Sequence, residues 1–155
     1  MRKTQETTWR VQLFAYVLLF LWLGVIFFMS SGNGSSAETS RIIGPLITFF
    51  FPTADEAFIA TAHAVVRKTA HLTEYAILAS LASRAFLNSS TSWIAGYWAM
   101  LSIGLVAVTA SVDEFNQSFN VERTGSPFDT LLDISGGLLA VALIWMIRKR
   151  IRPAV

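Results

Sequence analysis

Ionisable side chains occur where this sequence is otherwise apolar, and they are the best candidates for chemistry. His71 and Glu74 lie within one apolar run, and Asp113-Glu114 closes another. An ionisable group inside a membrane span costs on the order of a few kcal/mol, so function is the first explanation to consider. Imidazole and carboxyl groups serve as general acids and bases. The candidate acid–base residues are therefore His71, Glu74, Asp113 and Glu114.

Other polar residues nearby have side chains that could hold a substrate. Arginine and lysine bind phosphate or carboxylate groups, and arginine can do so with two parallel hydrogen bonds. Steps of four and three residues place Arg67, His71 and Glu74 on one helix face, and Asp129 and Asp133 one turn apart. The candidate substrate-binding residues are Arg67, Lys68, Tyr75, Gln117, Arg123, Asp129 and Asp133.

The same residues also have structural interpretations. Arg67, Lys68, Asp113 and Asp129 are close to predicted helix ends, where caps and ion pairs are common. A buried polar network that fixes helix packing would explain the deeper groups. Metal chemistry has little support, because the histidines show neither an H-x-x-x-H nor an H-E-x-x-H spacing. We expect no metal and no other cofactor, although a hard cation held by Asp and Glu stays conceivable.

The composition indicates where these residues work. Of the 155 residues, 54% are hydrophobic and 14% are charged, against roughly 25% charged in soluble domains. This hydrophobicity excludes a disordered chain. The absence of cysteine excludes a disulfide scaffold and thiolate metal sites. Net charge is only +2, and the basic residues flank apolar runs, so membrane lipids are expected partners and nucleic acid is not.

Four apolar segments are long enough to cross a bilayer, which takes about 20 residues. Because backbone hydrogen bonds must close internally in lipid, each should be helical. A shorter apolar stretch, about 42–52, is broken by Gly44-Pro45 and reads as re-entrant or interfacial. The sequence therefore predicts an all-α, four-helix transmembrane bundle, as one integral membrane domain over 1–155. The predicted spans are about 11–29, 69–87, 93–112 and 130–147.

The basic residues predict the orientation, because cytoplasmic flanks carry more Lys and Arg. Four spans put both termini on one side, together with Arg84. That side has eight basic residues and the other side has four. Both termini are therefore expected in the cytoplasm. The start of the second span, the end of the third and the start of the fourth then share the extracytoplasmic end, with nearly all the candidate residues.

Two polar stretches resemble the VanZ-like family of small bacterial membrane proteins. RKTAHLTEYAILASL, residues 67–81, is similar to the family's K-x-x-H-x-x-E-Y opening of a span. DEFNQSFNVERTGSPFDTLLDISGG, residues 113–137, is similar to its D-E-x-x-Q … R-x-G block with following acidic and glycine positions. The resemblance implies a role at the bacterial cell envelope. It also implies a link to low-level resistance to teicoplanin, a glycopeptide antibiotic that bears a lipid.

Three functions are compatible with these residues. The first is an enzyme that acts at the outer leaflet on a lipid-linked or cell-wall component. The second is a non-catalytic protein whose polar site binds a lipid headgroup or a glycopeptide, or recruits a partner. The third is a proton-coupled transporter that uses His71, Glu74 and Asp133 as a relay. Four spans without an internal repeat make a monomeric transporter a poor fit. Homo-oligomer formation is left open.

Overall fold

The computed structural model describes residues 2–30, 44–117 and 127–151. These residues form helices and short turns, and no strand occurs among them. The labelled helices are α1 (Arg2–Phe28), α3 (Glu56–Leu87), α4 (Ser92–Gly96), α5 (Trp98–Gln117) and α6 (Pro127–Ile151). Residues 44–50 form a further short helix within the predicted 42–52 segment. The first two residues of that segment lie outside the described part.

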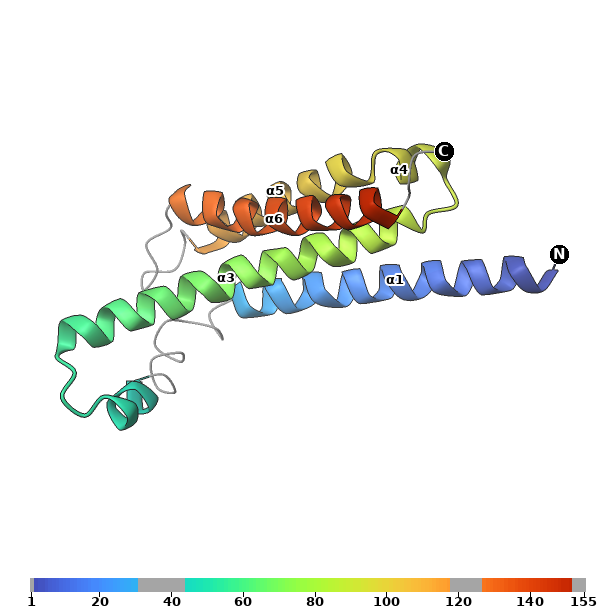
Figure 1. Cartoon of the computed structure of the whole chain (residues 1–155). Helices are drawn as coiled ribbons and strands as arrows, with labels where there is room; N and C mark the ends of the chain where they lie inside the picture. Colours follow the sequence, from blue (N-terminus) through green and yellow to red (C-terminus); the bar gives the residue numbers. More distant parts are fainter. Residues whose placement is uncertain (1, 31–43, 118–126, 152–155) are drawn as a thin grey trace.

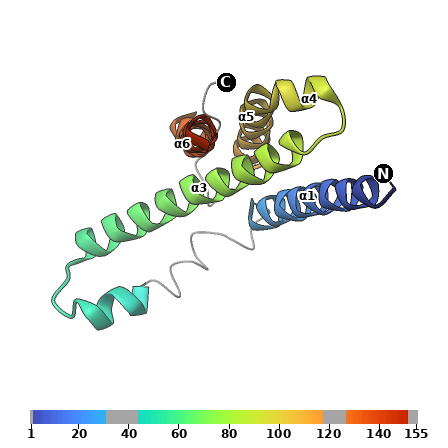
Figure 2. The same cartoon turned by 45° about the vertical axis from the view of Figure 1, so that its right-hand side comes forward.

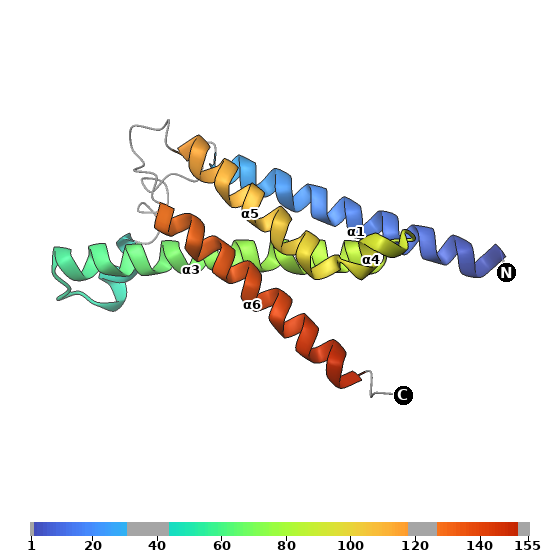
Figure 3. The ribbon, with the colours of Figure 1, turned by 90° about the horizontal axis from the view of Figure 1, so that it is seen from above.

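Helix α3 is the element on which the others pack. It contacts α1, α5 and α6, and α5 also contacts α6. Figure 1 shows the start of α1 and the end of α6 at one end of the molecule. The end of α1, the end of α5 and the start of α6 lie at the opposite end, beside the middle of α3. Seen from above, α6 crosses α3 obliquely (Figure 3). This arrangement brings three helix ends together around residues near the middle of α3.

The ends of α3 are set by side chains that cap them. The Asp55 side chain accepts a hydrogen bond of 2.7 Å from the backbone N–H of Phe58, which satisfies a free donor of the first turn. At the other end, the Asn88 side-chain amide donates to the Arg84 carbonyl at 2.7 Å. Between these caps the helix runs for 32 residues, about 48 Å at 1.5 Å per residue. The predicted span 69–87 is thus the later part of one continuous helix that begins at Glu56.

Two other helices have bounds that differ from the predicted spans. The predicted span 93–112 is divided at Tyr97, where α4 ends and from which α5 continues to Gln117. Asp113 and Gln117 therefore lie within the last turns of α5, which ends five residues beyond the predicted end of the span at residue 112. Helix α6 begins at Pro127. Proline has no backbone N–H, and at this position none is needed, because the N–H groups of the first turn have no partner within the helix.

Apolar side chains lie on the outside of this protein and several polar side chains lie inside, the opposite of a soluble protein. Large apolar groups cover the outside, among them Phe20 at 67% exposure and Leu139 at 62%. Polar groups are inside, including Asp113, Gln117 and Asp133, each less than 5% exposed. Water would make this arrangement costly, whereas lipid favours it.

Length and composition agree with that distribution. Among the described residues, three helices are long and apolar enough to cross a membrane: Trp9–Phe28, Trp98–Gln117 and Phe128–Ile151. Helix α3 is not in this group, and it carries Arg67, Lys68, Glu74 and Arg84 along its length.

Figure 2 shows that α3 begins well beyond the packed region, with the 44–50 helix beside its start. Exposed aromatic side chains gather there. Phe49, Phe50 and Phe51 are 77%, 65% and 55% exposed, and Phe58 in the first turn of α3 is 46% exposed. The rings of Phe51 and Phe58 lie 5.5 Å apart between centroids. This end of the molecule therefore has an apolar surface of its own, separate from the outer faces of α1, α5 and α6.

Candidate functional site

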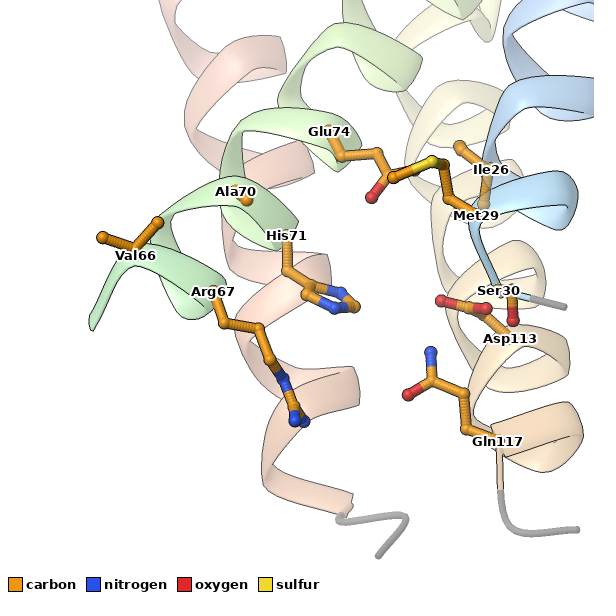
Figure 4. A pocket seen from close by; sticks show the side chains of 10 residues that line it. All are labelled: Ile26, Met29, Ser30, Val66, Arg67, Ala70, His71, Glu74, Asp113 and Gln117. Atoms are coloured by element: carbon orange, nitrogen blue, oxygen red, sulfur yellow. The ribbon is translucent and has the colours of Figure 1, made fainter. Parts of the chain in front are cut away.

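Helix α3 supplies three of the predicted residues to one pocket. Arg67, His71 and Glu74 all line it, as expected from their spacing of four and three residues along a helix. Figure 4 shows the His71 ring pointing from α3 toward Asp113 of α5, and the Arg67 side chain extending away from α3 beside α6. Their spacing predicts this shared face because all three residues belong to a single continuous helix.

Helix α5 supplies the opposite wall through its last two turns. Asp113 and Gln117 lie four residues apart and line the pocket, facing His71 in Figure 4. The Tyr75 hydroxyl, which is fully buried on α3, donates a hydrogen bond to Asp113 Oδ2 at 3.1 Å. Tyr75 is thus a support for the Asp113 carboxylate.

Helix α6 brings two acidic residues to the same end. Asp133 is 2% exposed, and its Oδ1 lies 3.5 Å from Nδ1 of His71. Asp129, one turn earlier, faces Arg67, with 3.4 Å between Asp129 Oδ2 and Arg67 Nη2. The two predicted binding residues of α6 therefore meet two different residues of α3.

Close packing of α3 and α6 makes these contacts possible. A methyl group at Gly136 would overlap the backbone carbonyl of Leu72, next to His71. A methyl group at Gly137 would lie 2.8 Å from Cγ1 of Val106 on α5. Glycine at these positions lets the helix backbones approach, as small residues commonly do in membrane proteins.

Helix α1 forms a wall that the sequence reasoning did not assign to the site. Ile26, Met29 and Ser30 line the pocket, and Ser30 is 4% exposed. The indole N–H of Trp22 donates to the backbone oxygen of Glu74 at 3.1 Å, which ties α1 to α3. A polar Ser30 at the end of a long apolar run was the available signal for this wall.

Five of the predicted residues that the structure describes do not line the pocket. Three of them, Tyr75, Asp129 and Asp133, contact residues that do line it. Lys68 is exposed and is not among the lining residues. Glu114 is half-buried, but it also does not line the pocket. Arg123 lies outside the described residues.

The pocket is small and strongly polar on one side. Its volume is about 100 Å³, enough for several waters, an ion or one small polar group. The nearby carboxyl groups are those of Glu74, Asp113 and Asp133, and the basic side chains are those of Arg67 and His71. Such a set can transfer protons, hold a cation, or orient a phosphate or carboxylate group.

Comparison with known proteins gives one family. The sequence model of the VanZ/LLP1 family matches residues 14–148, which is most of the chain. No curated protein and no solved structure matches significantly.

Proposed function

Because this chain belongs to the VanZ/LLP1 family, we propose that it is a multi-pass protein of the bacterial cytoplasmic membrane that works in the cell envelope. Its polar pocket would act on, or bind, a lipid-linked or cell-wall component. The VanZ-like resemblance adds reduced sensitivity to teicoplanin as the expected phenotype. The single observation that carries the proposal is one small pocket lined by Arg67, His71, Glu74, Asp113 and Gln117, within an assembly whose outside is apolar.

We propose that α3 is the fourth membrane crossing. Its contacts with α1, α5 and α6 place it among helices that are themselves apolar enough to cross. The ionisable residues His71 and Glu74 are on the side that faces the pocket, so lipid need not solvate them. Helix α3 is longer than the roughly 30 Å of hydrocarbon, and its first turns would extend past the bilayer surface.

The charge distribution supports an outward-facing pocket. Arg148, Lys149 and Arg150 lie at the opposite end of α6 from Asp129 and Asp133. Basic residues favour the cytoplasmic side, so the pocket would open toward the extracytoplasmic face. Both termini would then be cytoplasmic.

The aromatic surface formed by Phe49, Phe50, Phe51 and Phe58 fits the same orientation. Exposed phenylalanines suit the boundary between headgroups and acyl chains. We propose that the 44–50 helix and the start of α3 lie in the outer interface, next to the pocket. A lipid-bearing ligand would then place its chain near these rings and its polar group in the pocket, whose small volume admits one phosphate or carboxylate group.

The function is tested by expression in a teicoplanin-susceptible bacterium. Wild-type protein should raise the inhibitory concentration of teicoplanin relative to an empty vector. A glycopeptide without a lipid chain is the matched control, and its inhibitory concentration should change less. Equal inhibitory concentrations with and without the protein, at a verified level in the membrane, would contradict the proposal.

Catalysis and binding are separated by Glu74→Gln. This change keeps the size and hydrogen-bonding atoms of the side chain but removes its charge and its ability to accept a proton. Complete loss of the phenotype, with folding and ligand binding intact, would indicate chemistry at the pocket. Partial retention would indicate that only affinity is needed. Arg84→Gln, an exposed change at the other end of α3, is the control for the membrane level.

A further inference from the structure

Three possible metal ligands converge from three helices. His71 of α3, Asp113 of α5 and Asp133 of α6 each offer one ligand atom, and these atoms all lie within 4.8 Å of one another. Ligand atoms around a tetrahedral zinc ion are about 3.4 Å apart, given bonds of about 2.1 Å. The 3.5 Å between His71 Nδ1 and Asp133 Oδ1 already matches that spacing. Side-chain movements of roughly an ångström would bring Asp113 to the same spacing.

The atoms that would bind the metal are buried and lack hydrogen-bond partners. Asp113 and Asp133 are 3% and 2% exposed. Asp113 Oδ1, Asp133 Oδ1 and His71 Nδ1 each have no hydrogen-bond partner among the described residues. A buried polar atom without a partner is costly, and in native proteins it calls for a specific explanation. A bound cation would satisfy all three atoms at once.

Tyr75 leaves one oxygen of Asp113 available for such an ion. Its hydroxyl donates to Asp113 Oδ2 at 3.1 Å, so the carboxylate is held from one side while Oδ1 remains without a hydrogen bond. Outer residues commonly orient metal ligands in this way. Tyr75 is therefore a positioning residue for the site.

The local charge also favours a dication. Two carboxylates lie close together in apolar surroundings, where like charges repel strongly. Arg67, which lines the pocket, is paired with Asp129. An ion of charge +2 would balance the charges of Asp113 and Asp133 directly and would bind the neutral form of His71.

We propose that His71, Asp113 and Asp133 bind one divalent transition-metal ion, with Zn²⁺ or Mn²⁺ as the class of ion. One imidazole nitrogen with two carboxylates suits these ions better than Mg²⁺ or Ca²⁺, which prefer oxygen ligands alone. His71 and Asp113 also line the 100 Å³ pocket, so an open coordination position would face it. Three protein ligands with one open position are typical of catalytic zinc sites.

The first experiment uses the wild-type protein, purified in detergent without chelators. Its metal content is measured by mass spectrometry, and its thermal unfolding is followed after chelation and after addition of Zn²⁺, Mn²⁺ or Mg²⁺ alone. The proposal predicts close to one bound ion per chain, a lower unfolding temperature after chelation, and recovery with Zn²⁺ or Mn²⁺ but not Mg²⁺. A chain that unfolds at the same temperature in every condition, without retained metal, would overturn it.

Variants then locate the site. Asp133→Asn should abolish the metal-dependent shift in unfolding temperature. Asp129→Asn, one turn away and paired with Arg67, is the matched control and should retain it. Tyr75→Phe should weaken metal affinity by roughly 10- to 100-fold, the range for outer-shell changes. The protein loaded with Co²⁺ gives a second readout. Its visible absorption bands should disappear in Asp133→Asn and should be retained in Asp129→Asn. Equal metal binding by both aspartate variants would place the ion elsewhere and refute the site.

The metal proposal and the proposed envelope function can fail separately. Retained metal without any teicoplanin phenotype would contradict the proposed function and leave the metal site standing. A teicoplanin phenotype in a protein that binds no metal would contradict the metal site and leave the proposed function standing.

Discussion

Buried polar side chains occur in two places, and their hydrogen bonding separates their roles. Near the end of α3 and the start of α5, Ser83 donates to Ser102 at 3.2 Å, and Ser102 donates to the Trp98 carbonyl at 2.7 Å. Every member of that chain has a partner. At the pocket, by contrast, Asp113 Oδ1 and Asp133 Oδ1 have no hydrogen-bond partner among the described residues, and Asp133 Oδ1 lies 3.5 Å from His71 Nδ1. The serine pair is therefore a structural contact, whereas the carboxyl oxygens without a hydrogen bond support the binding role that we propose for Asp113 and Asp133.

Ser83→Ala tests the structural role of the serine pair. It removes the bond between α3 and α5 but leaves Ser102 bonded to Trp98. We expect a loss of about 0.6 kcal/mol in unfolding free energy, the average for hydrogen bonds between membrane helices. Thermal or denaturant unfolding in detergent measures it. Ser80→Ala is the control, because Ser80 is exposed and bonds only within its own helix; an equal loss in both variants would contradict the assignment.

At this scale, sequence spacing predicted contacts within a helix better than contacts between helices. Arg67, His71 and Glu74 line one pocket because one regular helix fixes their relative directions. The pairing of His71 with Asp133 depends on how closely α3 and α6 approach, which spacing along the chain does not encode. A metal was not expected, because the H-x-x-x-H and H-E-x-x-H spacings place both ligands on one helix, whereas His71, Asp113 and Asp133 come from three helices.

Among the helices, the contact of α3 with α6 determines the geometry of the site. Gly136 lies against the carbonyl of Leu72, the residue after His71, and Asp133 is one turn from Gly136. Any increase in the distance between the two backbones would therefore separate Asp133 from His71.

Gly136→Ala tests this contact. The added methyl group has no space against the Leu72 backbone, so α6 must move. We expect a loss of about 1–3 kcal/mol in unfolding free energy, as for other overpacked sites, together with a weaker teicoplanin phenotype. Gly104→Ala on α5 is the matched control, because a methyl group there meets nothing within 4 Å. Unchanged stability of Gly136→Ala would show that the helices are not so closely packed.

Helix bounds were harder to predict than helix existence. Apolar runs predicted the positions of α1, α5 and α6, because about 20 apolar residues in lipid can satisfy their backbone only as a helix. The start of α5 was predicted five residues early, since Trp93 and Ile94 continue the apolar run across the break at Tyr97. The length of α3 was missed because its first turns are less apolar than its later ones.

At the scale of the whole molecule, we expect both termini in the cytoplasm and the pocket at the extracytoplasmic face. Because the chain has no cysteine, single introduced thiols can test this orientation. Thr53→Cys and Ser90→Cys each introduce a single exposed thiol at opposite ends of α3. In intact cells, a membrane-impermeant maleimide should label Thr53→Cys and should label Ser90→Cys only after permeabilisation. The opposite pattern would reverse the topology and place the pocket on the cytoplasmic side.

The central claim is that residues from α3, α5 and α6 form one functional site. The most direct test is the teicoplanin tolerance conferred by His71→Gln, Asp113→Asn, Gln117→Leu and Asp133→Asn, each compared with Glu56→Gln at equal membrane levels. Glu56 is exposed in the first turn of α3, away from the pocket lining. The account predicts that the four pocket variants lose tolerance together while Glu56→Gln keeps it. Tolerance retained by the pocket variants, at normal membrane levels, would contradict it.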